Sequence, residues 1–162
     1  MKTGIWGRTL LGIAAICLAT SAASAAAKDP LVGNWDLDAA SSAVNGQPAF
    51  KSGHAAITVA KGVYTTVVDL TPASGAAIHY ETTFKADGVD VKVAGNTYFD
   101  SATLLRVDRN TSIRTERRGG KVVGVTTIEV SKDGKTLSSS GKGTLPDGKQ
   151  FARMLTWHRA KK

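Results

Sequence analysis

Leu31-Val32-Gly33-Asn34-Trp35-Asp36-Leu37-Asp38 is the stretch that decides the fold of this 162-residue chain. Gly33, Trp35 and Leu37 alternate along it with Asn34, Asp36 and Asp38. Successive side chains of a β-strand point to opposite faces, so this period of two predicts a strand over 31–38. One face of that strand is expected in a core and the other in solvent.

Nine further runs are rich in Val, Ile, Thr and aromatic residues and also predict strands. Pairs such as Asp87-Gly88 and Gly119-Gly120 separate most of them and favour the positive φ angles of tight hairpins. The short connections predict an all-β fold, an antiparallel up-and-down barrel of about eight to ten strands, rather than a Greek-key sandwich with longer crossovers. The predicted strands are His54–Ala60, Val63–Leu70, Ala77–Lys85, Val89–Ala94, Ala102–Asp108, Thr111–Arg117, Val122–Ser131, Thr136–Thr144 and Lys149–Arg159.

Two stretches lack a lasting strand pattern. Ala39–Gly53 contains Ser, Asn, Gly and Pro and is predicted to be a loop with room for one helical turn. Gly95–Asp100 is predicted to be a second loop and carries Tyr98 and Phe99. Aromatic side chains in such a loop form either a lid over a barrel mouth or a plug in its core, and the sequence leaves both open.

Residues 1–25 are expected to form a signal peptide for export. Basic residues precede an apolar run from Leu10 to Ala19, and Ala23-Ser24-Ala25 offers a cleavage site of small side chains. The apolar run predicts a signal helix that is too short to span a bilayer. We therefore expect cleavage after Ala25, one barrel domain over residues 26–162, and a periplasmic or secreted location.

Charge is distributed unevenly along the chain. Residues 101–162 hold 14 basic and 5 acidic side chains, a net charge of +9, and every arginine beyond the signal lies there. Guanidinium groups match carboxylate and phosphate oxygens, so this bias indicates either an anionic partner or a solvated basic surface. Cys17, the only cysteine, lies in the signal, so the mature chain is expected to have neither disulfides nor cysteine chemistry.

The Gly33-Asn34-Trp35-Asp36-Leu37 stretch, the Gly120-Lys121-Val122-Val123-Gly124 hairpin and the Ser131-Lys132-Asp133-Gly134-Lys135 turn together resemble one family. They are similar to small exported bacterial lipocalin-like (calycin) β-barrels, which open with Gly-x-Trp-x-Leu. The resemblance covers nearly all of residues 26–162. It implies a barrel whose interior holds a small apolar or amphipathic molecule. It also implies an arginine stacked on Trp35, a role open to Arg153 or Arg159.

Arg153 lies between Phe151 and Leu155 on an apolar strand face, where an unpaired charge is costly. The favoured interpretation is a cap on Trp35. The strand could instead turn this face outward, or Arg153 could be an interior cation for a ligand carboxylate, as in related lipid-binding barrels. The predicted structural motif is Gly33, Trp35, Arg153 and Arg159, and the candidate ligand-binding residues are Trp35, Tyr80, Phe84, Arg153 and Trp157.

No catalytic set is recognisable in the sequence. His54, His79 and His158 lie on separate predicted strands without metal-ligand spacing, so no metal site and no cofactor are expected. Ser139 and Lys142 have Ser-x-x-Lys spacing but lie in a strand, where the lysine is not stacked over the serine. We expect a non-catalytic barrel that binds a small apolar or anionic amphipathic ligand and no nucleic acid. The alternative is an envelope protein whose basic surface meets anionic lipid or a protein partner.

Overall fold

A computed structural model describes residues 28–46 and 49–161, and the predicted signal over residues 1–25 lies outside the described residues. Among the residues described, no helix is long and apolar enough to cross a membrane. Ten strands make up the described fold: β1 (Gly33–Asn45), β2 (Phe50–Ala60), β3 (Val63–Pro72), β4 (Ile78–Phe84), β5 (Val91–Lys92), β6 (Ser101–Arg106), β7 (Thr111–Arg118), β8 (Lys121–Val130), β9 (Thr136–Thr144) and β10 (Gln150–Arg159).

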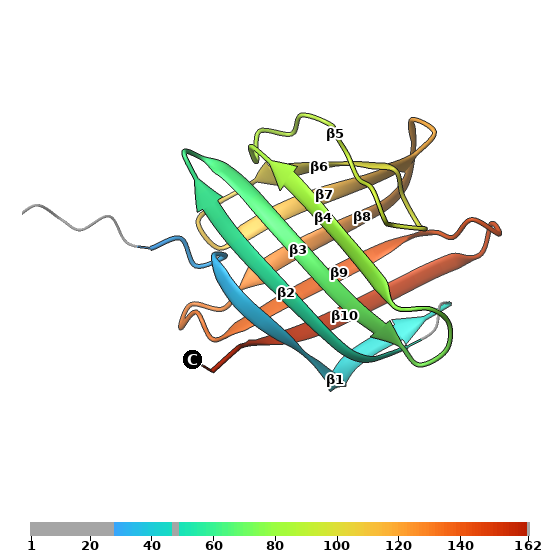
Figure 1. Cartoon of the computed structure of the whole chain (residues 1–162), viewed down its shortest axis with the longest axis horizontal. Helices are drawn as coiled ribbons and strands as arrows, with labels where there is room; N and C mark the ends of the chain where they lie inside the picture. Colours follow the sequence, from blue (N-terminus) through green and yellow to red (C-terminus); the bar gives the residue numbers. More distant parts are fainter. Residues whose placement is uncertain (1–27, 47–48, 162) are drawn as a thin grey trace, which may run out of the picture.

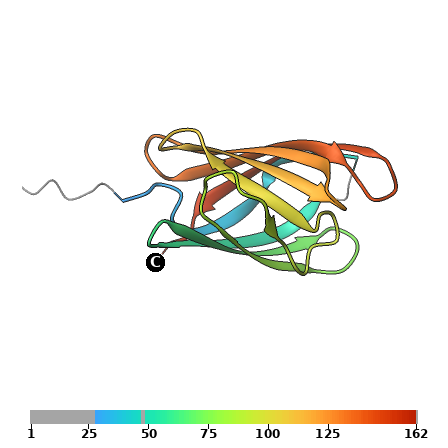
Figure 2. The same ribbon diagram turned by 90° about the horizontal axis from the view of Figure 1, so that it is seen from above.

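The strands form one antiparallel sheet that curls into a nearly closed barrel (Figure 1). Their order is β4-β3-β2-β1-β10-β9-β8-β7-β6-β5, a meander whose two halves are joined where β1 pairs with β10. Isolated bridges from Glu81 to Ala94 and from Asp87 to Leu105 cross the remaining gap. Seen from above, the two curved layers face each other across the interior (Figure 2). The predicted all-β, up-and-down barrel is confirmed.

The prediction of a loop over Ala39–Gly53 is wrong, because β1 and β2 extend into this stretch from both sides. The β1–β10 register shifts just after Asp38. There the Ser42 hydroxyl accepts a hydrogen bond from the Thr156 N–H (3.0 Å) and donates one to the Asp38 carbonyl (2.7 Å). A serine side chain thus replaces a backbone partner, and the strand shows no regular period in the sequence.

The predicted strand Val89–Ala94 is reduced to the two residues of β5. Gly88 and Gly95, which flank it, have φ angles of +81° and +80°. A Cβ atom on Gly95 would lie 2.6 Å from the backbone oxygen of His79 on β4. Glycine therefore lets the chain bend across the gap between β4 and β6 in close contact with β4, which shortens the strand.

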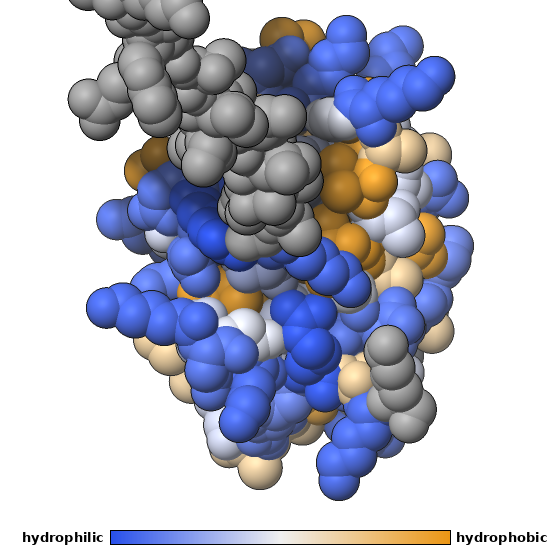
Figure 3. Space-filling model, turned by 90° about the vertical axis from the view of Figure 1, so that its left-hand side faces the viewer, coloured by the Kyte–Doolittle hydropathy of each residue, from blue (hydrophilic) through white to orange (hydrophobic). Residues whose placement is uncertain are grey.

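The core fills the barrel interior and is built from alternate strand positions. On β4, Tyr80, Thr82 and Phe84 are buried while the residues between them are exposed, as the period of two predicted. The same alternation on β10 buries Phe151, Leu155 and Trp157. Where grey atoms do not cover it, the outer surface at the end that carries the C-terminus is mostly hydrophilic, with apolar patches between the polar side chains (Figure 3).

Candidate functional site

One end of the barrel interior is closed by Trp35. Its side chain is fully buried, and its indole N–H donates to the Leu31 carbonyl (3.0 Å). The Arg159 guanidinium lies 4.2 Å from the centre of the indole ring. It donates to the backbone carbonyls of Gly134 (2.7 Å), Val32 (3.0 Å) and Pro30 (2.7 Å). Arg159 therefore joins the segment before β1 to the β8–β9 turn while it covers the indole.

The surroundings of Gly33 explain why the Gly-x-Trp motif begins with glycine. Its φ angle is +149°, and a Cβ atom there would lie 2.2 Å from Nη1 of Arg159. Three carbonyls hold this guanidinium in place, so it has little freedom to move aside for a larger residue. The glycine is therefore required by the close approach of the arginine that stacks on Trp35.

The structure corrects the role expected of Arg153: the arginine over Trp35 is Arg159. Arg153 points inward, since Ala152 and Met154 beside it on β10 are exposed, which also rules out the outward-turned strand face. Its guanidinium carbon lies 5.1 Å from the centre of the Phe151 ring, and its Nη2 lies 3.1 Å from Oε1 of Glu116. This position excludes the cap on Trp35 and the outward-turned face, and it makes Arg153 an interior cation paired with Glu116.

Arg114, Glu116 and Arg153 form a buried charge cluster within the barrel. Arg114 donates to Oε1 of Glu116 from Nε (3.0 Å) and Nη2 (2.6 Å), and the Thr126 hydroxyl donates to the same oxygen (3.3 Å). Exposed fractions of the side chains are 14% for Arg114, 3% for Glu116 and 11% for Arg153. Two guanidinium groups thus share one carboxylate, which leaves the cluster with one excess positive charge.

The pKa directions agree with a charged cluster. Burial alone would raise the pKa of Glu116, but Arg114 and Arg153 outweigh burial and hold that pKa below its ordinary value. Burial alone would lower the pKa of Arg114, but the nearby Glu116 and Tyr80 outweigh it and raise that pKa instead. Glu116 therefore stays ionised at neutral pH, and the guanidinium of Arg114 stays protonated.

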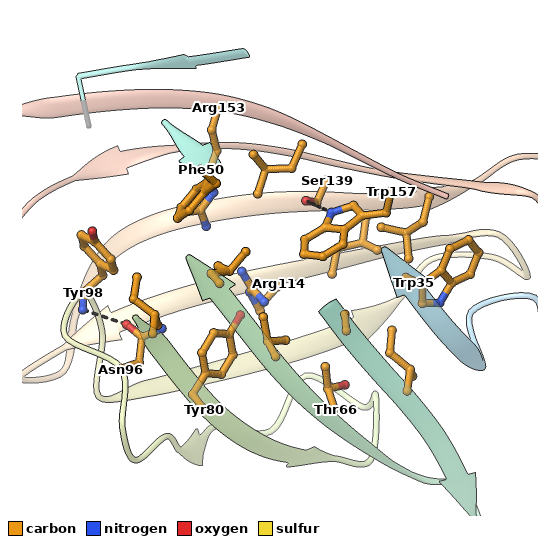
Figure 4. Close-up of a pocket in the computed structure, with 18 of the residues that line it drawn as sticks. Trp35, Phe50, Thr66, Tyr80, Asn96, Tyr98, Arg114, Ser139, Arg153 and Trp157 are labelled. Atoms are coloured by element: carbon orange, nitrogen blue, oxygen red, sulfur yellow. Dashed lines mark hydrogen bonds between the residues drawn. The ribbon is translucent and has the colours of Figure 1, made fainter. Parts of the chain in front are cut away.

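A cavity of about 90 Å³ extends from Trp35 past Arg114 and Arg153 of the charge cluster (Figure 4). Four of the five candidate ligand-binding residues line it: Trp35, Tyr80, Arg153 and Trp157. Phe84 does not; it is a buried core residue whose strand position pairs with Tyr64. Arg114 points toward Tyr80 in the middle of the cavity, while Phe50, Tyr98 and Arg153 lie at the end opposite Trp35. We call that opposite end the mouth.

The Gly95–Asp100 loop supplies both a plug and part of the mouth. Phe99 is buried and packs edge-on against Tyr80, with ring centres 6.0 Å apart, so it is a plug. Tyr98 is half-buried at the mouth. The Asn96 side chain accepts hydrogen bonds from the backbone N–H groups of Tyr98 (2.7 Å) and Phe99 (3.2 Å), which fixes the loop between them.

Sequence reasoning missed Arg114 and Phe50 as lining residues. Phe50 fell within the stretch predicted to be a loop. Arg114 lies on β7, whose inward positions Ser112, Arg114 and Glu116 are all polar. The sequence of β7 shows a period of two, but this period does not indicate which face of the strand points into the barrel. Ser139 also lines the cavity, where its hydroxyl lies 3.4 Å from the Trp157 indole nitrogen.

Comparison of the chain with family models, with curated proteins and with solved structures finds no match. The barrel is compatible with a lipocalin-like fold through its strand order and its Gly33-Trp35-Arg159 contact.

Proposed function

We propose that this protein is an exported, non-catalytic, lipocalin-like barrel that binds a small amphipathic molecule with an anionic group. The apolar part of the ligand occupies the cavity, and its anionic group contacts Arg153 near the mouth. The observation that carries this proposal is the excess guanidinium of the buried cluster, which faces an otherwise largely apolar cavity. A carboxylate would complete the pairing that Glu116 alone leaves unfinished.

The size of the cavity limits the ligand. Pockets that hold drug-sized molecules have volumes of about 300–1,000 Å³, and this cavity measures about 90 Å³. A cavity of about 150 Å³ is known to admit benzene. The ligand therefore has a short apolar part, and its entry requires the Phe50 and Tyr98 side chains to turn aside at the mouth.

The arginine bias of residues 101–162 favours the interior site over a basic docking surface. Each arginine of this part contacts another group of the protein, and three of them lie in the charge cluster or over Trp35. A surface site would thus depend on the lysines and on Arg109 and Arg118, whose contacts are backbone carbonyls. The contacts are Arg106 with Asp29, Arg109 with the Lys28 carbonyl, Arg114 and Arg153 with Glu116, Arg117 with Asp90, Arg118 with the Thr97 carbonyl, and Arg159 with three carbonyls.

Arg153→Met is expected to weaken binding of an anionic amphiphile by about 1.5–3 kcal/mol, the scale of a hydrogen bond to a charged group. Stability should change little, because Arg114 and Thr126 still satisfy Glu116. Isothermal titration with butanoate, and with butanol as the uncharged analogue, measures the effect. Only butanoate binding should fall in the variant.

The matched control is Lys132→Met, which removes one positive charge from the exposed β8–β9 turn at the Trp35 end. Its butanoate affinity should equal that of the unchanged protein. The proposal is contradicted if butanoate and other short-chain carboxylates fail to bind the unchanged protein. Equal losses in the two variants would show that net charge, rather than the interior guanidinium, attracts the ligand.

A further inference from the structure

Histidines and aspartates alternate in a single row across the outer face of the barrel. Direct cross-strand pairing places them side by side: His79 beside Asp69, Asp69 beside His54, His54 beside Asp36, and Asp36 beside His158. The row crosses β4, β3, β2, β1 and β10, which are consecutive strands of the sheet (Figure 1). It contains all three histidines of the chain. The sequence positions gave no sign of this, because the three residues are more than 20 positions apart.

The row is accessible to solvent and its imidazoles are oriented by carboxylates. Nδ1 of His54 lies 2.8 Å from Asp36, Nδ1 of His79 lies 2.6 Å from Asp69, and Nε2 of His158 lies 3.2 Å from Asp38. The exposed fractions of the histidine side chains are 45%, 67% and 57%. In each ring the second nitrogen makes no hydrogen bond to a described residue of the protein, so only the carboxylate contact holds the ring in its present orientation.

We propose that His54 and His158, on either side of Asp36, bind a divalent transition-metal ion of the zinc, nickel or copper class. Imidazole nitrogen and carboxylate oxygen are ligands that these ions accept. Asp38 adds a second carboxylate beside His158. The β2–β1–β10 part of the row therefore offers two nitrogen and two oxygen donors, the number that zinc uses in a tetrahedral site.

The pair around Asp36 is favoured over His79 and His54 around Asp69. Both of its carboxylates, Asp36 and Asp38, lie on β1, the strand between the two histidines. In the other group the second carboxylate is Asp36, which contacts His54 but lies outside the His79–His54 pair. Neighbouring strands are about 4.8 Å apart, so His54 and His158 are separated by about 10 Å. Two imidazoles turned toward each other can span this separation through one metal ion.

Binding requires the exposed side chains to turn. Among the described residues, no group of three or more His, Cys, Asp or Glu side chains is placed to hold a metal ion in the present conformation. Exposed side chains change rotamer within nanoseconds, and the side chains of His54, Asp36 and His158 are 45% to 60% exposed, so packing in the core locks none of them. Asp38 is 26% exposed and can stay in place: its Oδ1 accepts hydrogen bonds from two backbone N–H groups, and its Oδ2 already faces His158. The metal would replace the present His54–Asp36 and His158–Asp38 hydrogen bonds by coordination.

The test is zinc titration by calorimetry on the purified protein without a polyhistidine tag. His54→Ala and His158→Ala are each expected to weaken zinc binding by at least about tenfold, and Asp36→Asn to weaken it less. His79→Ala is the matched control, because it removes an imidazole of the same row outside the proposed pair; it should change the affinity less than about twofold.

Electron paramagnetic resonance of bound Cu²⁺ gives an independent readout on the unchanged protein. Hyperfine structure from two imidazole nitrogens is expected, and from one nitrogen in either single variant. Absence of zinc binding would overturn the proposal. So would a copper spectrum with a single nitrogen in the unchanged protein, or a loss on His79→Ala equal to that on His54→Ala.

Discussion

Trp35→Ala is expected to lower the free energy of unfolding by about 3–5 kcal/mol, the usual cost of truncating a buried tryptophan. The Trp35 side chain is fully buried, and its indole N–H is bonded to the Leu31 carbonyl. Its loss also removes the ring on which Arg159 lies. The guanidinium would then cover an empty space at the closed end of the cavity, so both packing and the cation–π contact are lost.

Urea unfolding followed by circular dichroism measures this effect. Because the loss is a large part of the stability of an ordinary domain, Trp35→Phe is the second variant, and it should be destabilised by a smaller amount. The phenyl ring preserves a surface for Arg159 but leaves the Leu31 carbonyl without its indole partner. A Trp35→Ala protein as stable as the unchanged one would contradict the place of Trp35 in the core.

Glu116→Gln is expected to destabilise the protein by about 3–5 kcal/mol, as when one partner of a buried ion pair is removed. The carboxylate is 3% exposed and is shared by Arg114 and Arg153, whose positive charges would remain buried without a counter-charge. Glu129→Gln is the matched control. That residue is exposed on neighbouring β8, so its variant should unfold at nearly the same urea concentration as the unchanged protein.

The pH dependence of this loss follows from the lowered pKa of Glu116. Burial opposes the shift, but Arg114 and Arg153 outweigh burial, so the pKa is lower in the folded than in the unfolded state. The carboxylate therefore contributes its stability above the ordinary value of 4.5, and this is lost as pH falls through the lowered value. The difference between the unchanged protein and Glu116→Gln, measured by urea unfolding from pH 7 to pH 3, should shrink. A constant difference would contradict the assignment.

The barrel was predictable from the sequence, whereas the charge cluster was not. Turns such as Asp133-Gly134 mark strand ends by local backbone chemistry, which a sequence displays directly. Arg153 and Arg159 are an even number of residues apart on β10, so the alternation of the strand places both on the same face. Only the three-dimensional position of Trp35 decides which of them reaches the indole. Arg114 was missed for a related reason, since a polar strand face looks the same whether it meets water or a buried counter-charge.

The pairing of β1 with β10 determines when the barrel can close during folding, because it joins the first strand of the chain to the last. Trp35 is paired with Arg159, a partner 124 positions later, and the Ala160 N–H donates to the Asn34 carbonyl (2.9 Å). Hairpins such as β2–β3 and β7–β8 can form as soon as their own residues are available. The barrel cannot close until its last strand has been made, because β1 has no other partner on that side. Contacts this distant in sequence slow folding, so the unpaired edge of β1 is exposed to other chains for as long as β10 is missing.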